Sequence, residues 1–413
     1  MKALRFHYSV PRYLSTLILG KVSPFFYTGP TSPLRYEEIP EPVPPGPDWV
    51  VVRTRLAGIC GSDINMVKLH DSPSASPYAS YPFVLGHENV GEVHIAGEAC
   101  DLAPGTRVVV DPLLPCRTRG IEPVCQRCSE GNTSQCEHFI DGVLSPGLLL
   151  GACRDTGGSF SEYYLAHVSQ VIPLPDSVSD EEAVLLDAFA SALHPVLRHR
   201  PGNNDTVLVI GAGVIGQCVI AAIRALSVKC RTIVLAKYGY QERMAKHFGA
   251  DEVIRSTRDL DTLFAQVAVA TGGRVLKPIV GRPVLHGGAD VVFECVGNDL
   301  TLDLALRFAR SGGKVCLVGL ASQAQGVDWT PVWLNELTIA GSFAYGDEVR
   351  AGERTSTYRW GLDMIAEGAV RLSPLLTHRF PLSKYREAFA LLQSKAGQEV
   401  FKCAFSFREE DKN

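Results

Sequence analysis

The amino-acid sequence predicts an α/β protein with two domains, one rich in irregular β structure and one built on a doubly wound parallel sheet. Three observations support this prediction. Short apolar runs broken by glycine and proline fill about residues 36–175, which is typical of antiparallel β structure. From about residue 178, apolar strands alternate with helical segments, which is typical of a parallel sheet covered on both faces. A glycine-rich turn at residues 211–216 joins a strand to a helix.

The composition is ordinary for a soluble globular chain. The 413 residues include 40 Lys and Arg against 44 Asp and Glu, with no long run of one sign. We therefore expect a small-molecule partner, with no nucleic acid and no membrane. No apolar stretch approaches the roughly 18 residues of a membrane span, and the first residues lack the pattern of a signal peptide. Twelve cysteines without a secretion signal favour the cytoplasm and suggest metal sites before disulfides.

The β-rich region comes first in the chain. Residues 36–56 contain a proline-rich turn and then a strand-like run that ends near Leu56. The runs VLGHENVGEVHIAG, GTRVVVDP and GGSFSEYYLA follow, separated by glycine and proline. At residues 177–199, SVSDEEAVLLDAFASALHPVLRH predicts a helix, which Ser179 or Asp180 would cap, with acidic residues in its first turn.

Repeated strand and helix patterns make up the parallel-sheet region. TVLVIGAGVIGQCVIAAIRAL predicts a buried strand, a turn and a helix, RTIVLAK predicts a strand, and QERMAKHFGAD predicts a helix closed by Gly249. The runs ADVVFECVG, GGKVCLVGL and ELTIAGSF predict three further strands. After residue 345, the helical TYRWGLDMIAEGAV and the strand-like EVFKCAFSF do not extend this series, so we expect them to return to the first domain.

The glycine turn after the strand VLVI predicts a dinucleotide site. Gly211 permits a tight turn, Gly213 lets the backbone approach a pyrophosphate, and Gly216 lets helix and strand pack closely. The helix that starts at Val214 and Ile215 presents free N–H groups to the phosphates. A glycine turn without a ligand is the alternative, which the strand–turn–helix setting disfavours.

The residues after the second strand of this region bear on cofactor choice. A site for NAD normally has Asp or Glu there, which binds the ribose 2′-hydroxyl. This chain has Ala236-Lys237-Tyr238 instead, with Arg243 following. Lys237 and Arg243 suit the 2′-phosphate of NADP, and Tyr238 suits stacking on adenine, so NADP is favoured over NAD. Two solvated cations at a helix end are the alternative.

Residues with metal-binding chemistry occur in several segments. Cys60 lies in GICGSD, His87 and Glu88 lie in GHE, and Asp187 lies in LLDAF. Thiolate, imidazole and carboxylate are zinc ligands, and three of them leave a fourth position for water or substrate. Each residue also has a structural alternative. Cys60 could fill space in the core, His87 could be a buried histidine with satisfied hydrogen bonds, and Asp187 could be an acid near the start of a helix. A separate group of four cysteines falls within 21 residues, at Cys116, Cys125, Cys128 and Cys136.

The order of GICGSD, GHE, the cysteine group, GGSFSEY and GAGVIG resembles the zinc-dependent medium-chain dehydrogenase/reductase family, which includes the alcohol and polyol dehydrogenases. The likeness extends from about residue 36 to 407. It implies a GroES-like catalytic domain at residues 1–185 and 346–413, with a structural zinc lobe at about 112–140. It also implies a Rossmann dinucleotide-binding domain at residues 186–345.

The resemblance further implies an activity and a set of zinc ligands. It implies hydride transfer between an alcohol, or its aldehyde or ketone, and NADP or NAD, in a homodimer or homotetramer. The implied ligands of the catalytic zinc are Cys60, His87 and Asp187, with Glu88 as a second candidate carboxylate. Two alternatives are a zinc-free reductase and a zinc-stabilised NAD(P)-binding sensor or structural protein without turnover. The particular alcohol cannot be predicted from the sequence.

Residues near the implied zinc ligands have roles by the same resemblance. Ser62 matches a hydroxyl that relays the substrate proton, and Asp63 matches a carboxylate that orients the ring of His87. Many relatives carry His where this chain has Asn65. Because Asn does not titrate near pH 7, the proton would leave through water, the cofactor ribose or another residue such as His70.

The cysteine group departs from the pattern of the family in one place. CQRC and the gap to Cys136 match a lobe in which four thiolates close around one zinc. Relatives place the first cysteine three residues before the second, where this chain has Glu122, and Cys116 stands as the displaced first ligand. The longer loop adds little closure entropy. Three cysteines with Glu122, or no metal, are the alternatives.

Further cofactor contacts are implied at the carboxyl ends of the later strands, where ligands bind in open α/β sheets. Lys402 aligns with a basic residue that binds the pyrophosphate, although a solvated lysine on a terminal strand is its alternative. The other contacts carried over are Val296, Gly297, Gly319, Leu320 and Phe343.

Overall fold

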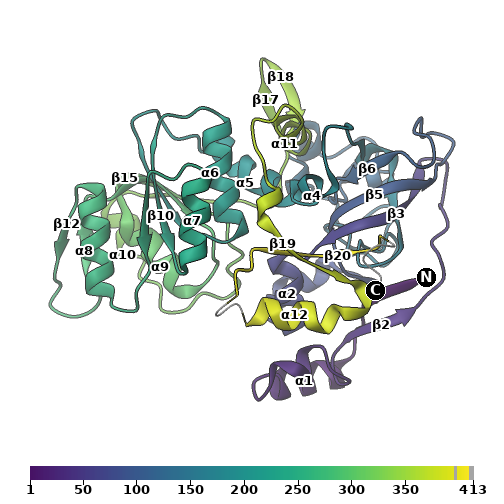
Figure 1. The fold of residues 1–413 in the computed structure, drawn as a ribbon, viewed down its shortest axis with the longest axis horizontal. Coiled ribbons are helices and arrows are strands. Elements are labelled where there is room, and N and C mark those ends of the chain that lie inside the picture. The colour runs from purple at the N-terminus through teal and green to yellow at the C-terminus, as the bar shows by residue number, and fades with distance from the viewer. Residues whose placement is uncertain (395–397, 409–413) are drawn as a thin grey trace. The chain divides into compact units, whose positions relative to one another are not determined.

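The chain divides into two compact units in the computed structural model, which describes residues 1–394 and 398–408 (Figure 1). Unit 1 comprises Met1–Asp187 and Val349–Asn413, and unit 2 comprises Ala188–Glu348. The catalytic-domain segment predicted at 346–413 includes residues 395–397 and 409–413, which lie outside the described part.

A sheet of seven strands forms the centre of unit 1. Its order is β19-β20-β3-β5-β6-β8, with β7 also paired to β3. Neighbouring strands are antiparallel except β19 and β20, which are parallel. Strand β20, close to the end of the chain, pairs with β3, so it lies beside a strand from the first sixty residues. The strands are β3 (Trp49–Gly58), β5 (Glu88–Ile95), β6 (Arg107–Val110), β7 (Tyr163–His167), β8 (Val171–Pro173), β19 (Leu376–Pro381) and β20 (Lys402–Ser406).

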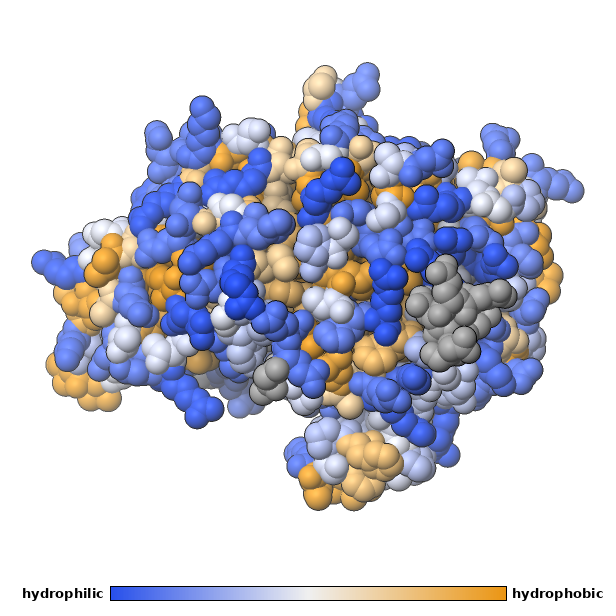
Figure 2. Space-filling view, in the orientation of Figure 1, coloured by the Kyte–Doolittle hydropathy of each residue, from blue (hydrophilic) through white to orange (hydrophobic). Residues whose placement is uncertain are grey.

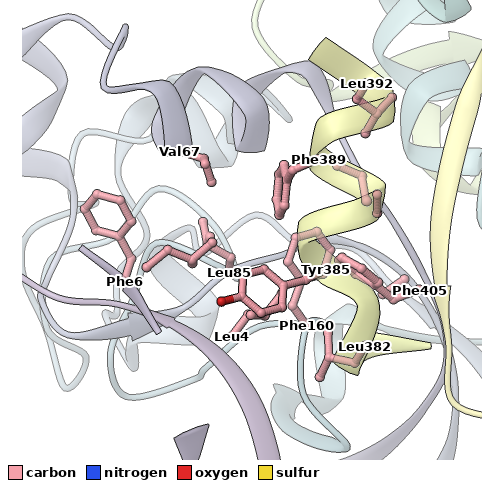
Figure 3. Close-up of a cluster of buried hydrophobic side chains, with 14 of the residues drawn as sticks. Leu4, Phe6, Val67, Leu85, Phe160, Leu382, Tyr385, Phe389, Leu392 and Phe405 are labelled. Carbon is pink, nitrogen blue, oxygen red and sulfur yellow. The ribbon is translucent and has the colours of Figure 1, made fainter. Parts of the chain in front are cut away.

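A smaller sheet and a group of helices complete unit 1. The small sheet has the order β2-β1-β4, with β1 (Lys2–Phe6), β2 (Leu34–Glu38) and β4 (Phe83–Val84). Apolar side chains of β1, α2, α12 and β20 meet in one buried cluster, which includes Leu4, Val67, Phe389 and Phe405 (Figure 3). The helices are α1 (Val10–Leu19), α2 (Gly61–Lys68), α3 (Gln126–Ser129), α4 (Asp180–Ala183), α11 (Thr357–Ala366) and α12 (Tyr385–Gln393).

Unit 2 contains a six-stranded sheet in which all neighbours are parallel, in the order β11-β10-β9-β14-β15-β16. The chain moves outward from β9 to β11 and then returns to β14 on the other side of β9. This reversal is the switch point at which such sheets bind ligands. The strands are β9 (Thr206–Ile210), β10 (Arg231–Ala236), β11 (Glu252–Arg255), β14 (Ala289–Glu294), β15 (Ala309–Leu317) and β16 (Thr338–Gly341).

Helices and a short hairpin accompany this sheet. The hairpin of β12 (Arg274–Leu276) and β13 (Val284–His286) follows α8. A second hairpin, β17 (Asp347–Arg350) and β18 (Glu353–Ser356), begins at the end of unit 2 and continues into unit 1. No helix in the described ranges is both long and apolar enough to span a membrane. The helices are α5 (Leu186–Arg198), α6 (Val214–Ala225), α7 (Gly239–His247), α8 (Leu260–Thr271), α9 (Asp299–Phe308) and α10 (Thr330–Leu334).

The predicted fold class, β-rich structure plus a doubly wound parallel sheet, is confirmed, with one difference in detail. The helix predicted at residues 177–199 is two helices, α4 and α5, which are separated at Val184 and Leu185. Ser179 rather than Asp180 caps α4, because its hydroxyl oxygen accepts the N–H of Glu182 at 3.2 Å. Asp180 is instead the first residue of the helix.

Candidate active site and metal centres

The first cluster brings together donors that lie 27 residues apart in the chain. Cys60 precedes the first turn of α2, and His87 and Glu88 stand at the start of β5. Strands β3 and β5 pair so that Gly58 lies opposite Glu88, which carries the segment after β3 toward His87. One ligand atom from each of Cys60, His87 and Glu88 lies within 4.8 Å of the other two. His87 and Glu88 are buried, and Cys60 is half-buried.

Asp63 connects the two segments of this cluster. One of its carboxylate oxygens accepts the backbone N–H of Cys60 at 2.8 Å, and the other lies 3.8 Å from Nδ1 of His87. The hydrogen bond from Cys60 caps the start of α2. The oxygen near His87 faces the imidazole but is too far away for a direct hydrogen bond. Burial raises the pKa of Asp63 to about 6, against the charge of His87, which lowers it. The carboxylate is therefore held in a low-polarity setting beside the ring that it was predicted to orient.

Glu88 forms a buried ion pair with Lys402 of β20. Nζ of Lys402 lies 2.5 and 2.7 Å from the two carboxylate oxygens of Glu88 and donates also to the carbonyl of Ile59 at 3.3 Å. Burial opposes the charge on Lys402, but Glu88 and Cys60 outweigh it and raise the pKa above its ordinary value. Gly58 makes room for this pair, since a Cβ there would lie 2.1 Å from Oε2 of Glu88.

These contacts bear on two sequence predictions. Lys402 was predicted to bind the pyrophosphate of the cofactor, and the structure places its ammonium against a carboxylate of the zinc-ligand cluster. The sequence carried no signal for this pairing, because Glu88 and Lys402 are 314 residues apart. Glu88 was a candidate carboxylate ligand, and both of its oxygens already accept from Lys402.

Asp187 lies in the first turn of α5 and is buried. It is not part of the group of three within 4.8 Å, but its negative charge raises the pKa of both His87 and Lys402. The structure therefore places Asp187 in the same electrostatic environment as the cluster. Ser62, the predicted relay hydroxyl, is half-buried in the first turn of α2, and His70 is exposed just after the end of that helix.

The donor set of this cluster fits zinc. Thiol, imidazole and carboxylate are the sulfur, nitrogen and oxygen ligands that zinc takes in catalytic sites. Burial alone would lower the pKa of His87, but Asp63 and Cys60 outweigh it and hold the pKa well above its ordinary value. The surroundings of the imidazole are thus strongly anionic, and a divalent cation would satisfy them as a proton does.

The second cluster consists of the four cysteines predicted to bind a structural zinc. One Sγ atom from each of Cys116, Cys125, Cys128 and Cys136 lies within 4.8 Å of the others. Sγ of Cys116 and Sγ of Cys136 are 3.6 Å apart, near the ~3.8 Å edge of a tetrahedron with Zn–S bonds of about 2.3 Å. All four cysteines are free of disulfides. The displaced Cys116 therefore joins the group, as the four-thiolate prediction requires.

Backbone N–H groups prepare these sulfur atoms for negative charge. Cys125 N–H donates to Sγ of Cys116 at 3.3 Å, Cys128 N–H donates to Sγ of Cys125 at 3.4 Å, and His138 N–H donates to Sγ of Cys136 at 3.4 Å. The thiol of Cys128 lowers the pKa of Cys136 to about 5, and the same contact raises the pKa of Cys128. Burial also raises the pKa of Cys116 to about 11, so a bound cation such as zinc would favour the thiolates of Cys116 and Cys128 that the protein alone disfavours.

Arg119 organises the lobe around these cysteines, and the sequence prediction missed it. Its side chain is fully buried, and among the described residues it forms no ion pair. Its three nitrogens donate instead to backbone carbonyls of the loop that wraps around it, which are those of Leu114, Asp141, Leu144, Ser145 and Gly147. A planar guanidinium with five N–H donors is suited to such a ring of carbonyls.

The glycine turn in unit 2 has the geometry of a dinucleotide-binding turn. Gly211 follows β9 with φ of +99°, which favours glycine. A Cβ on Gly216 would lie 1.8 Å from the carbonyl oxygen of Gly211, so helix and turn pack as closely as predicted. Gly213 precedes the first turn of α6, and a Cβ there would meet no atom within 4 Å. Backbone at Gly213 is thus open to a ligand, as a pyrophosphate on the start of α6 needs.

Neighbouring strand ends border this turn. A Cβ on Gly211 would lie 2.3 Å from Cγ2 of Val296, which places the ends of β9 and β14 side by side. Buried Glu294 fixes the second loop, because its carboxylate accepts the N–H groups of Val296 and Gly297 at 2.9 and 3.0 Å. Gly319 packs directly on Gly297. The apolar residues predicted to contact the cofactor, Val296, Leu320 and Phe343, are exposed.

The end of β10 carries the residues predicted to select the cofactor. Nζ of Lys237 lies 5.3 Å from the centre of the Tyr238 ring, and Tyr238 stacks on Tyr240. A Cβ on Gly239 would lie 3.9 Å from Nη1 of Arg243 and 3.2 Å from Nη1 of Arg255, the last residue of β11. Arg255 was not predicted at this site from the sequence, because only the pairing of β10 with β11 brings it beside Ala236.

A dinucleotide turn in one unit and a buried sulfur–nitrogen–oxygen donor set in the other define the class of zinc- and nicotinamide-dependent oxidoreductases. Comparison with known families agrees. Residues 46–176 match the alcohol dehydrogenase GroES-like domain, and residues 214–366 match the zinc-binding dehydrogenase domain.

Individual relatives extend over nearly the whole chain. L-idonate 5-dehydrogenase of Vitis vinifera is 30% identical over 362 residues, which cover 87% of this chain and 88% of that protein. Sorbitol dehydrogenase of Arabidopsis thaliana is 30% identical over 362 residues, with coverage of 87% and 89%. A solved dehydrogenase from Sinorhizobium meliloti 1021, bound to NADP, has a TM-score of 0.68 at 26% identity and covers 90% of this chain and 95% of that one. The chain belongs to the zinc-dependent medium-chain dehydrogenase/reductase family and is an enzyme.

Proposed function

We propose that this enzyme oxidises an alcohol group of a small polyhydroxylated substrate, and reduces the matching carbonyl compound in reverse, with NADP as its preferred cofactor. The observation that carries the proposal is the buried group of Cys60, His87 and Glu88 in a chain that also has an open dinucleotide turn. By their names, the two curated relatives above act on L-idonate and on sorbitol, which are both polyhydroxylated.

Cys60, His87 and Asp187 would hold the catalytic zinc in this proposal. Glu88 is the second candidate carboxylate, but both of its oxygens accept from Lys402, which favours Asp187 as the third ligand. When bound, zinc supplies a Lewis acid for the substrate oxygen, and the nicotinamide ring supplies the hydride acceptor. Asp63 holds the segment of Cys60 and faces the ring of His87, so it positions both ligands.

Ser62 would accept the proton that the substrate hydroxyl loses. It lies two residues after Cys60, and a hydroxyl both accepts and donates hydrogen bonds. Asn65, one turn further along α2, does not titrate near neutral pH. His70 is the next imidazole along the chain and is exposed, so it would pass the proton to solvent.

A preference for NADP rests on the cations at the ends of β10 and β11. Arg243 and Arg255 lie beside Gly239, and Lys237 lies over the neighbouring ring of Tyr238. Arg255 also pairs with Glu242 at 3.6 Å, but Ala236 stands where a site for NAD has its carboxylate. We expect Lys237→Ala to raise KM for NADP by about tenfold or more, as loss of a charge-assisted bond to phosphate would, and to change KM for NAD by less than about twofold. Lys229→Ala, an exposed lysine elsewhere in unit 2, is the matched control. Equal effects on the two cofactors would remove the argument for a 2′-phosphate site.

The proposed setting is a homodimer or homotetramer in the cytoplasm, with the catalytic domain at residues 1–185 and 346–413. Twelve disulfide-free cysteines suit a reducing compartment. Trp333 and Leu334 are exposed close to edge strand β16, which favours a contact between subunits there. Light scattering on the purified protein tests the assembly, and a monomer would exclude it.

The activity itself is tested by a screen with and without metal. Sorbitol, L-idonate and simple alcohols, with NADP and with NAD, are assayed before and after chelation of the enzyme. Turnover should disappear with the metal and return with zinc alone. Full activity in protein that metal analysis shows to be free of zinc would refute the proposal.

A further inference from the structure

Residues 7–33 form a long connection between strands β1 and β2, which we call the excursion. It leaves the small sheet after β1 and returns at β2, which pair with each other from Lys2↔Glu38 to Phe6↔Leu34. It precedes the family-matched region, which begins at residue 46. Helix α1 and the short helical turn Pro24–Tyr27 make up most of it. No role in the dehydrogenase chemistry follows from its position.

One side of the excursion is anchored to the protein. Thr16 is fully buried and its hydroxyl donates to the carbonyl of Thr31 at 3.0 Å, while Tyr27 and Leu17 pack on the core cluster shown in Figure 3. From α12, Nε of Arg386 donates to the carbonyl of Thr28 at 3.1 Å. The excursion is therefore held in place, and its outer side is presented in a fixed orientation.

The outer side is apolar. Leu14 is 52% exposed, Ile18 65% and Val22 80%, and Phe25 is similarly exposed. Figure 2 shows hydrophobic surface gathered over α1, at the bottom of the view. Tyr8, Val10 and Tyr13 add to it. We call these seven side chains the α1 face. An exposed cluster of this kind marks a contact surface.

The segment that carries the α1 face contains cations and no acidic residue. Residues 1–36 contain five Lys and Arg and no Asp or Glu, although the whole chain has a net charge of −4. Lys2 and Arg5 face Glu38 and Glu37. Arg12 and Arg35 both donate to the carbonyl of Pro30, at 2.9 and 2.8 Å, and Lys21 is exposed. Within the described ranges, no carboxylate forms an ion pair with these last three cations.

We propose that the α1 face docks this enzyme on an anionic phospholipid surface, lying in the headgroup layer with its apolar side chains inserted. An apolar helix face in a segment whose charged side chains are all cations is the pattern of such interfacial helices. A second copy of the chain fits less well, because a two-fold contact would bring Arg12, Lys21 and Arg35 of one copy toward the same cations of the other. The near-neutral charge of the whole chain led to the prediction of no membrane partner. Residues 1–36 carry a local positive charge that the net charge of the whole chain does not reveal.

Co-sedimentation of the full chain with vesicles tests this docking. Vesicles of phosphatidylcholine containing about 30% phosphatidylserine are compared with pure phosphatidylcholine, at about 0.1 M and about 0.5 M salt. The protein should bind the anionic vesicles at least about tenfold more tightly than the neutral ones, and salt should weaken the binding.

Variants separate the apolar and the electrostatic parts. Leu14→Gln with Ile18→Gln should weaken vesicle binding by more than about tenfold, because two apolar side chains no longer insert. Lys21→Glu should weaken it by about tenfold or more, at roughly fivefold per unit charge. The control is Ile279→Gln with Val280→Gln, an even more exposed apolar pair in the loop of the β12–β13 hairpin, which should bind like the wild type.

The dehydrogenase activity of every variant in vesicle-free buffer checks that it has folded, and it should stay within about twofold of the wild type. Equal binding to neutral and anionic vesicles would overturn the proposal, as would binding that survives the Leu14 and Ile18 changes. Absence of binding, or self-association that the same changes abolish, would overturn it as well.

Discussion

The two metal-ligand clusters of unit 1 are built on opposite plans. The cluster of Cys60, His87 and Glu88 mixes three donor types from distant segments and includes a resident cation, Lys402. The cysteine cluster takes four identical donors from a stretch of 21 residues and is served by backbone N–H groups. Four thiolates close a zinc coordination sphere, whereas a mixed set of three, proposed above as Cys60, His87 and Asp187, leaves a position open. The proposed function accordingly assigns a stabilising role to the local cluster and the chemistry to the long-range one.

The largest effect that sharpens this comparison is expected at Cys60. Cys60→Ser removes one ligand of the open site, and loss of about 4 kcal/mol of charge stabilisation corresponds to roughly a 10³-fold fall in kcat. Cofactor affinity and Tm should change little, because unit 2 and the cysteine cluster are untouched. Steady-state kinetics and a cofactor titration measure this. Turnover within tenfold of the wild type would contradict the assignment.

Cys136→Ser should lower the stability of the protein more than its turnover, the opposite of Cys60→Ser. It opens the four-thiolate site, so we expect about 3 kcal/mol or more of lost stability, a clear fall in Tm, and proteolytic cleavage within residues 112–140. Turnover at low temperature should fall far less than in Cys60→Ser. Cys100→Ser, a half-buried cysteine outside both clusters, is the control for either variant. A variant with unchanged Tm and protease resistance would argue against a structural metal.

Arg119→Met tests whether the lobe depends on its guanidinium as well as on metal. The change leaves five backbone carbonyls without their donor, which should cost about 2–3 kcal/mol in the free energy of unfolding. Arg117→Met, at an exposed position of the same helical turn, should cost almost nothing. Urea titration of both variants provides the measurement, and equal costs would show that the buried contacts contribute little.

The smallest effect is expected at an ion cluster outside both metal sites. Asp180 accepts from Arg55 at 2.8 Å and from Arg107 at 2.8 Å, and it also pairs with Arg408. Burial would raise the pKa of Asp180, but Arg408 and Arg55 outweigh it and hold the pKa below its ordinary value. The stabilisation is therefore complete above about pH 4 and is lost as the pH falls through the lowered pKa.

Asp180→Asn should consequently lose about 1–2 kcal/mol of stability at neutral pH, and the difference from the wild type should shrink as the pH falls below about 4. Chemical denaturation across that pH range measures it. A difference that is the same at all pH values would mean that the ionised carboxylate is not the source.

Sequence patterns were sufficient for the features that depend on local spacing. The glycine turn, the capping hydroxyl of Ser179 and the cysteine group lie within short stretches, where residue type and spacing determine geometry. The fold class followed for the same reason, since periodicity reveals each strand and helix in turn. The break between α4 and α5 was missed because apolar residues continue across it.

Long-range pairings were beyond the sequence. Lys402 was predicted at the pyrophosphate and instead contacts Glu88, because the pairing of β20 with β3 decides where its ammonium lies. Arg255 joins the cations of β10 only through the register of β10 and β11. Arg119 gave no signal, because its partners are backbone carbonyls, which every sequence has.

The zinc content per chain decides whether unit 1 holds two separate metal sites. Metal analysis of the purified protein should give about 2 zinc ions per chain in the wild type and about 1 in both Cys60→Ser and Cys136→Ser, with activity missing only from the first. The account would be contradicted if the wild type held about 1 zinc, or if Cys60→Ser kept the full wild-type content.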